Sequence, residues 1–189
     1  MGQLEGFAER KHRISVRDYH RMGETGVLAP EARVELIEGE IFDRAPIGKN
    51  HASIVDRLNR MFVLAAGERA IVRVQGPVRM GEHSEPGPDL TLLRPRADYY
   101  RDVAPGAGDV LLIVEVSDTT QRYDRRVKVP LYARHGVPEV WVIDLENALA
   151  HFYRGPAGES YAEISASERP GVAPVSALPG GAIDLSGLL

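Results

Sequence analysis

The feature that most constrains the fold is a run of apolar, largely β-branched side chains from Val110 to Ser117. A run of this length and composition predicts a central, buried β-strand. Near its end the run carries one acid, Glu115. Acids are depleted from central strands, and a lone carboxylate is costly to bury unless another group stabilises it. The run therefore predicts a strand with a polar site at its end.

A second acid, Asp89, follows Gly87 and Pro88 and leads into a shorter apolar run that also predicts a buried strand. Carboxylates on neighbouring strand ends suit a hard cation such as Mg²⁺ or Mn²⁺, which can stabilise charge on a phosphate and generate a hydroxide. The backbone carbonyl of Val116 is a plausible third metal ligand. Asp89 is equally explained as a turn residue at the start of a strand, and that alternative stays open.

Lys128 completes the candidate catalytic set. Only three of the 23 basic residues are lysines, and an ammonium, unlike a guanidinium, can lose its proton. In a helix, Asp124, Lys128 and Tyr132 would lie along one stripe. Lys128 would then position or deprotonate the attacking water, or neutralise the transition state. The spacing equally fits an exposed helical ion pair with Asp124, worth only ~0.3–0.5 kcal/mol.

Four further residues are candidates for supporting roles. Glu35 could contribute a carboxylate for a second ion or orient a water, while His51 and Tyr132 could contact phosphate. Arg125 is a candidate substrate-binding residue on the same helix as Lys128. Each also has an ordinary structural explanation: a solvated strand residue, a core histidine, a packed tyrosine and an arginine on a solvated helix face.

Hydrophobic periodicity and turn signals predict the remaining elements. A capping box at Ser15 and Asp18 opens a short helix, and Glu38-Gly39 joins a hairpin. The helix that carries Lys128 contains Pro130, so it is either kinked or begins only near Val129. The predicted ranges are strands 34–37, 40–42, 70–74, 77–80, 140–144 and 148–154, and helices 50–66 and about 120–134.

Composition narrows the possible classes of protein. The 189 residues, 43% of them apolar, predict one folded domain over 1–189, with an N-terminal helical segment over 1–30 and a docked tail over 165–189. The absence of cysteine excludes disulfides and thiol chemistry. No stretch resembles a membrane span or a signal peptide, which predicts a cytoplasmic protein. The net charge of −4 argues against coating nucleic acid by bulk electrostatics, although a local basic face is compatible with it.

Over about residues 15–189 the chain resembles the Uma2 family, bacterial proteins described as restriction endonucleases. The resemblance lies in a set of short stretches, of which the segments around the two acids and the lysine are the central ones. The matching stretches are Asp18-Tyr19, Val34 to Glu40, His51, Pro88-Asp89-Leu90, Ile113 to Ser117, Asp124 through Lys128 to Tyr132, and Gly136 to Trp141.

The resemblance implies the restriction-endonuclease-like PD-(D/E)xK fold, an α/β arrangement in which helices flank a mixed sheet. It also implies a Mg²⁺-dependent endonuclease acting on DNA, with Asp89 and Glu115 as its acids. The chain departs from the simplest form of the signature, because Ser117 stands where that signature has lysine. Lys128, on the following helix, is the position that matches the family's lysine. Cutting two strands would suit a homodimer.

Two other functions stay open at this point. The domain could keep the nuclease fold as a catalytically inactive scaffold that binds nucleic acid or protein. Alternatively, the two carboxylates could hydrolyse sugars by acid and base catalysis, which would not depend on metal. The single tryptophan argues against the sugar alternative, because few aromatic platforms are available to bind a sugar ring.

Overall fold

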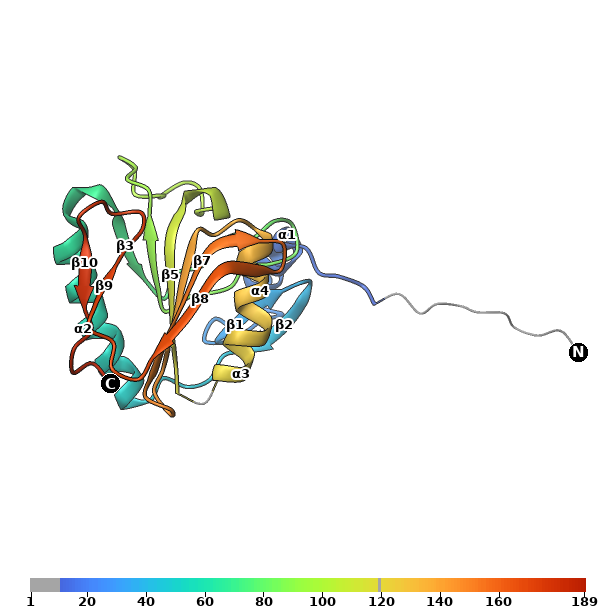
Figure 1. Ribbon diagram of the computed structural model, residues 1–189. Coiled ribbons are helices and arrows are strands. Elements are labelled where there is room, and N and C mark those ends of the chain that lie inside the picture. The colour runs from blue at the N-terminus through green and yellow to red at the C-terminus, as the bar shows by residue number, and fades with distance from the viewer. Residues whose placement is uncertain (1–10, 119) are drawn as a thin grey trace, which may run out of the picture.

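The computed structural model describes residues 11–118 and 120–189, which build a mixed sheet covered by helices on both faces (Figure 1). The sheet has six strands in the order β3-β4-β5-β6-β7-β8. They are β3 Ile71–Val74, β4 Leu90–Leu93, β5 Val110–Ser117, β6 Glu139–Asp144, β7 Leu149–Ala157 and β8 Ser160–Ser167. Only β5 and β6 are parallel, and the other neighbours are antiparallel. The predicted mixed sheet flanked by helices is confirmed.

Strand β5 is central, as predicted, and all of its residues are buried. Successive side chains point to opposite faces, so Leu112 and Val114 enter one hydrophobic core and Ile113 enters the other. The odd-numbered face also receives Glu115 and Ser117 at the end of the strand. The strand's alternation therefore directs these two polar side chains toward the same layer of the molecule.

Helix α2 (Lys49–Ala66) covers the first face, and its bounds agree with the predicted helix. Phe62 of α2 packs against Trp141 of β6, with ring centroids 5.5 Å apart. The C-terminal tail completes this layer: β9 (Val172–Pro174) pairs with β10 (Ala182–Asp184), and both lie beside α2 (Figure 1). The tail buries six apolar side chains in the same core, namely Ala173, Val175, Leu178, Ile183, Leu185 and Leu188.

The second face is covered by a helix with an irregular turn. It runs through α3 (Gln121–Tyr123), a π-helical segment η3 (Asp124–Lys128) and α4 (Val129–Arg134). The Val129 amide donates to the Asp124 carbonyl, five residues back, and Pro130 follows within the first turn of α4. A proline lacks an amide hydrogen, so this is a position where it is tolerated. The π turn, a form often found at functional sites, keeps the helix continuous past the proline.

The N-terminal elements lie beside this second layer. Helix α1 (Val16–Glu24) is capped as predicted, with Ser15 Oγ accepting from the Asp18 amide at 3.1 Å. The predicted hairpin is present as β1 (Val34–Ile37) and β2 (Glu40–Asp43). Both residues of its turn, Glu38 and Gly39, have positive φ angles, which match the twist of a two-residue hairpin loop.

Several predicted boundaries are wrong. Residues 77–80 form no strand: Val78 and Met80 donate to carbonyls of the following loop, and Arg79 makes only an isolated bridge to Gly106. Strand β8 and the β9–β10 hairpin were not predicted, because β8 is mostly exposed and polar and the tail is rich in glycine and proline. The loop around 94–108 ends in a 3-10 turn, Ala107–Asp109, and another, Gly67–Arg69, follows α2. Residues 1–10 of the predicted N-terminal segment lie outside the described residues.

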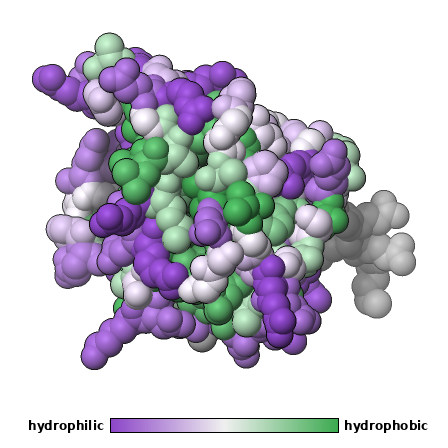
Figure 2. All heavy atoms as spheres, turned by 60° about the vertical axis from the view of Figure 1, so that its left-hand side comes forward, coloured by the Kyte–Doolittle hydropathy of each residue, from purple (hydrophilic) through white to green (hydrophobic). Residues whose placement is uncertain are grey.

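The outer surface carries no continuous apolar belt on the side of α2 and the tail hairpin. Figure 2 shows this side, on which apolar side chains form separate groups between polar ones. Leu64 and Val172, which are 74% and 68% exposed, are among the exposed apolar residues of these elements. Within residues 11–118 and 120–189, no helix combines the length and apolar character needed to cross a lipid bilayer.

One buried acid joins the tail to the sheet. Glu139, at the start of β6, is fully buried, and its Oε1 accepts from Trp141 Nε1 and Arg154 Nε, both at 2.7 Å. Its Oε2 accepts from the Ser176 amide at 2.9 Å. Both carboxylate oxygens are therefore occupied, and each donor comes from a different part of the α2-side layer.

We expect Glu139→Ala to lower the free energy of unfolding by about 2–3 kcal/mol, because it leaves a partly buried guanidinium and an indole N–H without an acceptor. Amide hydrogen exchange in residues 172–184 should accelerate, since the tail loses its bond to the sheet. Glu163→Ala, an exposed position on β8, is the matched control and should change stability by less than about 0.5 kcal/mol. Urea unfolding measures both; equal losses in the two variants would contradict this role of Glu139.

Candidate active site

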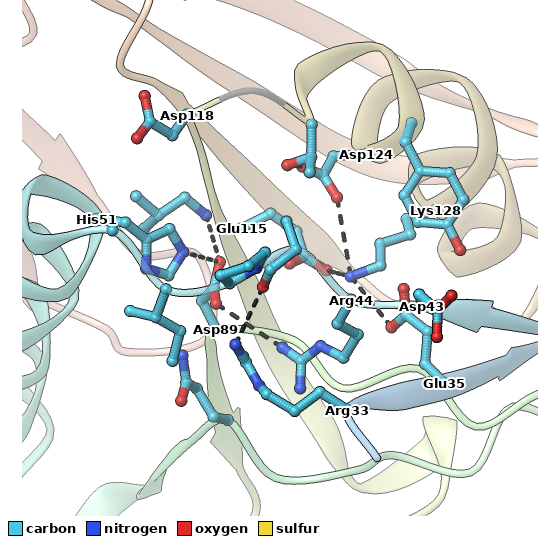
Figure 3. Close-up of a pocket in the computed structure, with 18 residues that line it drawn as sticks. Arg33, Glu35, Asp43, Arg44, His51, Asp89, Glu115, Asp118, Asp124 and Lys128 are labelled. Carbon is cyan, nitrogen blue, oxygen red and sulfur yellow. Dashed lines mark hydrogen bonds and ion pairs between the residues drawn. The ribbon is translucent and has the colours of Figure 1, made fainter. Parts of the chain in front are cut away.

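Asp89 and Glu115 meet because of the register between β4 and β5. Leu90 pairs with Val114 in this antiparallel ladder, so the residue before β4 faces the residue after Val114. The Val116 amide donates to Asp89 Oδ2 at 2.9 Å, which ties the Asp89 side chain to β5. Both acids line one cavity of about 220 Å³, shown in Figure 3. Two acids from different strands thus converge on one space.

Glu115 is 2% exposed and makes two hydrogen bonds through the same oxygen. Its Oε1 accepts from the Tyr132 hydroxyl at 2.5 Å and from Lys128 Nζ at 3.2 Å. Burial raises the pKa of Glu115 to about 8, against the opposing attraction of the ammonium. Without a second cation beside it, ionisation of this carboxyl is therefore unfavourable near neutral pH.

Lys128 lies between three carboxylates. Its Nζ is 3.2 Å from Glu115 Oε1, 3.3 Å from Glu35 Oε2 and 3.8 Å from Asp124 Oδ1, and its side chain is 5% exposed. Burial alone would lower the lysine pKa, but the nearby carboxylates outweigh it, and the pKa of Lys128 is raised above its ordinary value. Pro130 does not carry Lys128 away from the site, because the π turn directs the side chain inward (Figure 3).

Asp124 is buried, so its pairing with Lys128 is not the exposed helical ion pair that the sequence left open. The hydroxyls of Ser117 and Thr120 both donate to Asp124 Oδ2 at 2.7 Å. Burial raises the pKa of Asp124, against the attraction of Lys128 and the two hydroxyl hydrogen bonds. Ser117 stands where the simplest signature has lysine, and here it anchors the acid beside the lysine supplied by the helix.

Glu35 connects the hairpin to the site. It is 3% exposed on β1, and its Oε2 accepts from the Gly87 amide at 3.1 Å and faces Lys128. The predicted alternative of a solvated strand residue is therefore wrong. Glu35 holds the segment that leads into Asp89, and at the same time balances the charge of Lys128.

His51 projects from the first turn of α2 toward Asp89 (Figure 3). Its Nε2 is 3.1 Å from Asp89 Oδ2, and this hydrogen bond raises the pKa of His51. Burial would raise the pKa of Asp89, but the hydrogen bond and charge of His51 and the Val116 amide together lower it. The pKa of Asp89 is thus lowered, whereas that of Glu115 is raised to about 8.

The structure adds a residue that sequence reasoning missed. Arg44, at the end of the hairpin, extends its guanidinium toward Asp89, with Nη2 4.0 Å from Oδ1 (Figure 3). It passes so close to Gly87 that a Cβ there would lie 2.8 Å from Arg44 Nη1. The glycine of the Gly-Pro-Asp entry therefore leaves room for this cation, a signal that becomes interpretable only once the fold is known.

Two predicted substrate-binding residues are not brought into the cavity. Tyr132 has no exposed surface, and its hydroxyl donates to Glu115, so it positions that acid and cannot contact phosphate directly. Arg125 lies on the other side of the helix, where its Nε donates to Tyr153 at 3.2 Å. The helical turn points residues 124 and 128 inward and residue 125 away, whereas Tyr132 points inward but is covered completely.

The donor set fits a magnesium-like ion bound through few protein ligands. Within the described residues, no three or more histidine, aspartate or glutamate side chains gather as a ready-made metal cage. Mg²⁺ commonly binds through one or two carboxylates and keeps several waters. Asp89 Oδ1 faces Arg44 at a distance too long for a hydrogen bond, and burial, which raises the pKa of Glu115, is a cost that a bound cation would offset. Asp89, Glu115 and the backbone of Val116 would hold such an ion.

We expect opposite stability effects from removing the lysine and from neutralising the acid beside it. Lys128→Met should lower the free energy of unfolding by about 3 kcal/mol or more at pH 7, because three buried acids lose their common partner. Glu115→Gln should cost far less, since it keeps an acceptor for Tyr132 and removes a carboxyl whose ionisation is unfavourable.

The difference in stability between Glu115→Gln and the wild type should depend on pH, and this dependence tests whether the raised pKa of Glu115 is its cause. The raised pKa means that Glu115 contributes stability below about pH 4.5, its unfolded value, and loses it as pH rises through about 8. Glu115→Gln should therefore gain stability relative to the wild type between pH 5 and pH 9. Urea unfolding in EDTA across this range measures the difference, and a constant difference would contradict the assignment.

Comparison with known proteins supports the family and the fold. The family model "Uma2: Putative restriction endonuclease" matches residues 16–186. A solved structure, a "putative nuclease belonging to DUF820" from Anabaena variabilis, is 19% identical with a TM-score of 0.70, and the match covers 93% of this chain and 97% of that one. At this identity the likeness establishes a shared fold. No curated protein matches. Because the family match spans nearly the whole chain, the protein belongs to the Uma2 family.

Proposed function

We propose that this protein is a metal-dependent endonuclease that hydrolyses phosphodiester bonds of DNA. The observation that carries the proposal is the convergence of Asp89 and Glu115 on one cavity, with the ammonium of Lys128 bonded to Glu115. The family description and the name of the solved neighbour support a nuclease. The buried charges support chemistry at this place, because a protein seldom buries several ionisable groups without a use for them.

In this proposal Asp89, Glu115 and the Val116 carbonyl hold Mg²⁺ or Mn²⁺. A bound ion of this kind stabilises charge on the phosphate and lowers the pKa of a coordinated water. The pKa of Asp89 is lowered and that of Glu115 is raised, and this difference suits the two acids to the role. Asp89 is ionised in advance, and the ionisation of Glu115 would be coupled to the arrival of positive charge.

Lys128 acts in its protonated form. Its raised pKa disfavours the alternative in which it deprotonates water at neutral pH. An ammonium held beside Glu115 instead orients the attacking water and neutralises charge that develops on the phosphate. Glu35 and Asp124 fix the position of Nζ, so Glu35 serves as a positioning residue in preference to a ligand of a second ion.

Arg44 and His51 would contact the scissile phosphate. The Arg44 guanidinium makes no hydrogen bond within the described residues, so its donors are available to phosphate oxygens. Each cavity would cut one strand, so we propose that a homodimer, acting in the cytoplasm, cleaves both strands of a duplex.

The decisive experiment is cleavage of labelled single-stranded DNA, duplex DNA and RNA with Mg²⁺ or Mn²⁺. We expect metal-dependent cleavage of DNA that EDTA abolishes. Asp89→Asn should reduce it at least ~100-fold, since the ion loses a charged ligand, while the melting temperature stays close to wild type. Asp56→Asn, at an exposed position of α2, should cleave normally. Failure of the wild type on all three substrates would favour the inactive, binding scaffold.

Arg44 gives a second test that does not depend on turnover. A guanidinium beside Asp89 Oδ1 repels a metal ion that uses the same oxygen. Arg44→Ala should therefore bind Mn²⁺ about tenfold more tightly, and yet cleave DNA more slowly because it lacks a phosphate contact.

Electron paramagnetic resonance of free Mn²⁺ measures the affinity, and Arg60→Ala, an exposed arginine of α2, is the control. Arg44→Lys should retain the weaker wild-type affinity, because it keeps the charge. An unchanged Mn²⁺ affinity in Arg44→Ala would rule out the competition between guanidinium and metal.

A further inference from the structure

A second cavity, of about 460 Å³, opens on the opposite side of the helix that carries Lys128. It lies between the π turn and strands β7 and β8, which run beside α4 (Figure 1). Three arginines of the helix line it, Arg122, Arg125 and Arg126, together with Tyr153 of β7 and Ser160 of β8. We refer to Arg122, Arg125 and Arg126 with this cavity as the arginine groove.

The arginine groove carries an excess of positive charge. All three guanidinium-bearing side chains are exposed, and none of them forms an ion pair within the described residues. Glu159, the one carboxylate at the cavity, pairs with Arg134 at 2.9 Å. Arginines three and four residues apart on one helix repel each other, at a cost of roughly 0.2–0.5 kcal/mol per pair. An anion between them would turn that repulsion into attraction.

The groove is also partly preorganised. Arg125 Nε donates to the Tyr153 hydroxyl at 3.2 Å, so this exposed guanidinium is oriented by one hydrogen bond to β7. A planar guanidinium fixed in one orientation loses less entropy when it binds an oxyanion. Ser160, at the start of β8, adds a hydroxyl that can donate to the same anion.

The two cavities share one helical turn. Asp124 and Lys128 point into the candidate active site, while Arg125 and Arg126, between them in sequence, point into the arginine groove. A helix with its side chains is roughly 10 Å across, and phosphates along one DNA strand repeat roughly every 3.4 Å of helix axis. An anion that reaches both cavities must therefore extend over several nucleotides.

We propose that the arginine groove is a second nucleic-acid site, which binds backbone phosphates of the same duplex whose scissile phosphodiester enters the acidic cavity. The proposal rests on the nuclease function proposed above and makes the substrate a polyanion of several base pairs. In this proposal the arginines contact phosphates and not base edges, so the groove contributes affinity and register without reading sequence. It also supplies local attraction that the net charge of −4 does not.

Duplex binding without turnover tests the groove. Fluorescence anisotropy of the full chain with a labelled 20-base-pair duplex is measured in EDTA at several salt concentrations. We expect the triple variant Arg122→Gln, Arg125→Gln, Arg126→Gln to bind at least ~10-fold more weakly. Its slope of log affinity against log salt should fall by up to ~2.7, about 0.9 for each phosphate that the variant no longer neutralises.

The matched control removes the same charge elsewhere. Arg17→Gln, Arg21→Gln and Arg60→Gln change three exposed arginines of α1 and α2, and this variant should retain most of the wild-type affinity and slope. A second test variant, Arg122→Lys, Arg125→Lys, Arg126→Lys, keeps the charge and should restore the slope. It also separates weaker binding from a folding defect.

The outcomes separate this inference from the proposed nuclease activity. If the glutamine variant binds duplex with the wild-type affinity and slope, the inference is overturned, even if the protein cleaves DNA. A groove that binds free phosphate but not the duplex would give this same result. Equal weakening by the control variant would also overturn it, because net charge alone would then explain the effect. If binding depends on the groove but the wild type cleaves nothing, the groove is still a duplex-binding site and the nuclease proposal fails.

Discussion

The ammonium of Lys128 among three buried carboxylates is the contact on which the rest of the structure depends. Glu35, Glu115 and Asp124 come from the hairpin, the central strand and the π turn, so a single cation joins three separate elements. Without it, Asp124 and Glu35 would lose their common cation in a poorly solvated space, and Glu115 would be still harder to ionise. The same contact places an amine beside a candidate metal ligand. Stability and chemistry therefore share one interaction, and substitutions there alter both.

Much of the fold was predictable because its strongest signals are local. The apolar run at 110–117 forms the central strand, and the three-and-four spacing of apolar residues identifies α2. The elements that were missed lack such signals. Strand β8 is mostly exposed and so shows little apolar alternation, and β9 and β10 are held by long-range contacts of the tail with α2 and Glu139. The segment 77–80 has strand-like composition, but its amides bond to nearby loop carbonyls.

The candidate site was predictable where residue type conflicts with its surroundings. Glu115 in an apolar strand and Lys128 in an arginine-rich chain are conspicuous, and the structure brings both to Asp89's cavity. Residues whose role depends on the direction in which the side chain points were harder to predict. Arg125 lies on the opposite side of the helix from Lys128, and Tyr132 shares the inward side but is wholly buried against Glu115. A helical pattern in the sequence shows neither the π turn nor this burial. Arg44 is one of 20 arginines, and only the space left by Gly87 distinguishes it.

A helix supplies the amine of Lys128, whereas both candidate acidic metal ligands belong to the sheet. This arrangement has a mechanical consequence. A small slide of that helix over the sheet would change the separation of Nζ and Glu115 without breaking any strand pairing. The hydroxyls of Ser117 and Thr120 donate to Asp124, and these hydrogen bonds would oppose such a movement. Because the two cavities share this helix, only a shift of the helix as a whole would connect events in the arginine groove with the position of the amine.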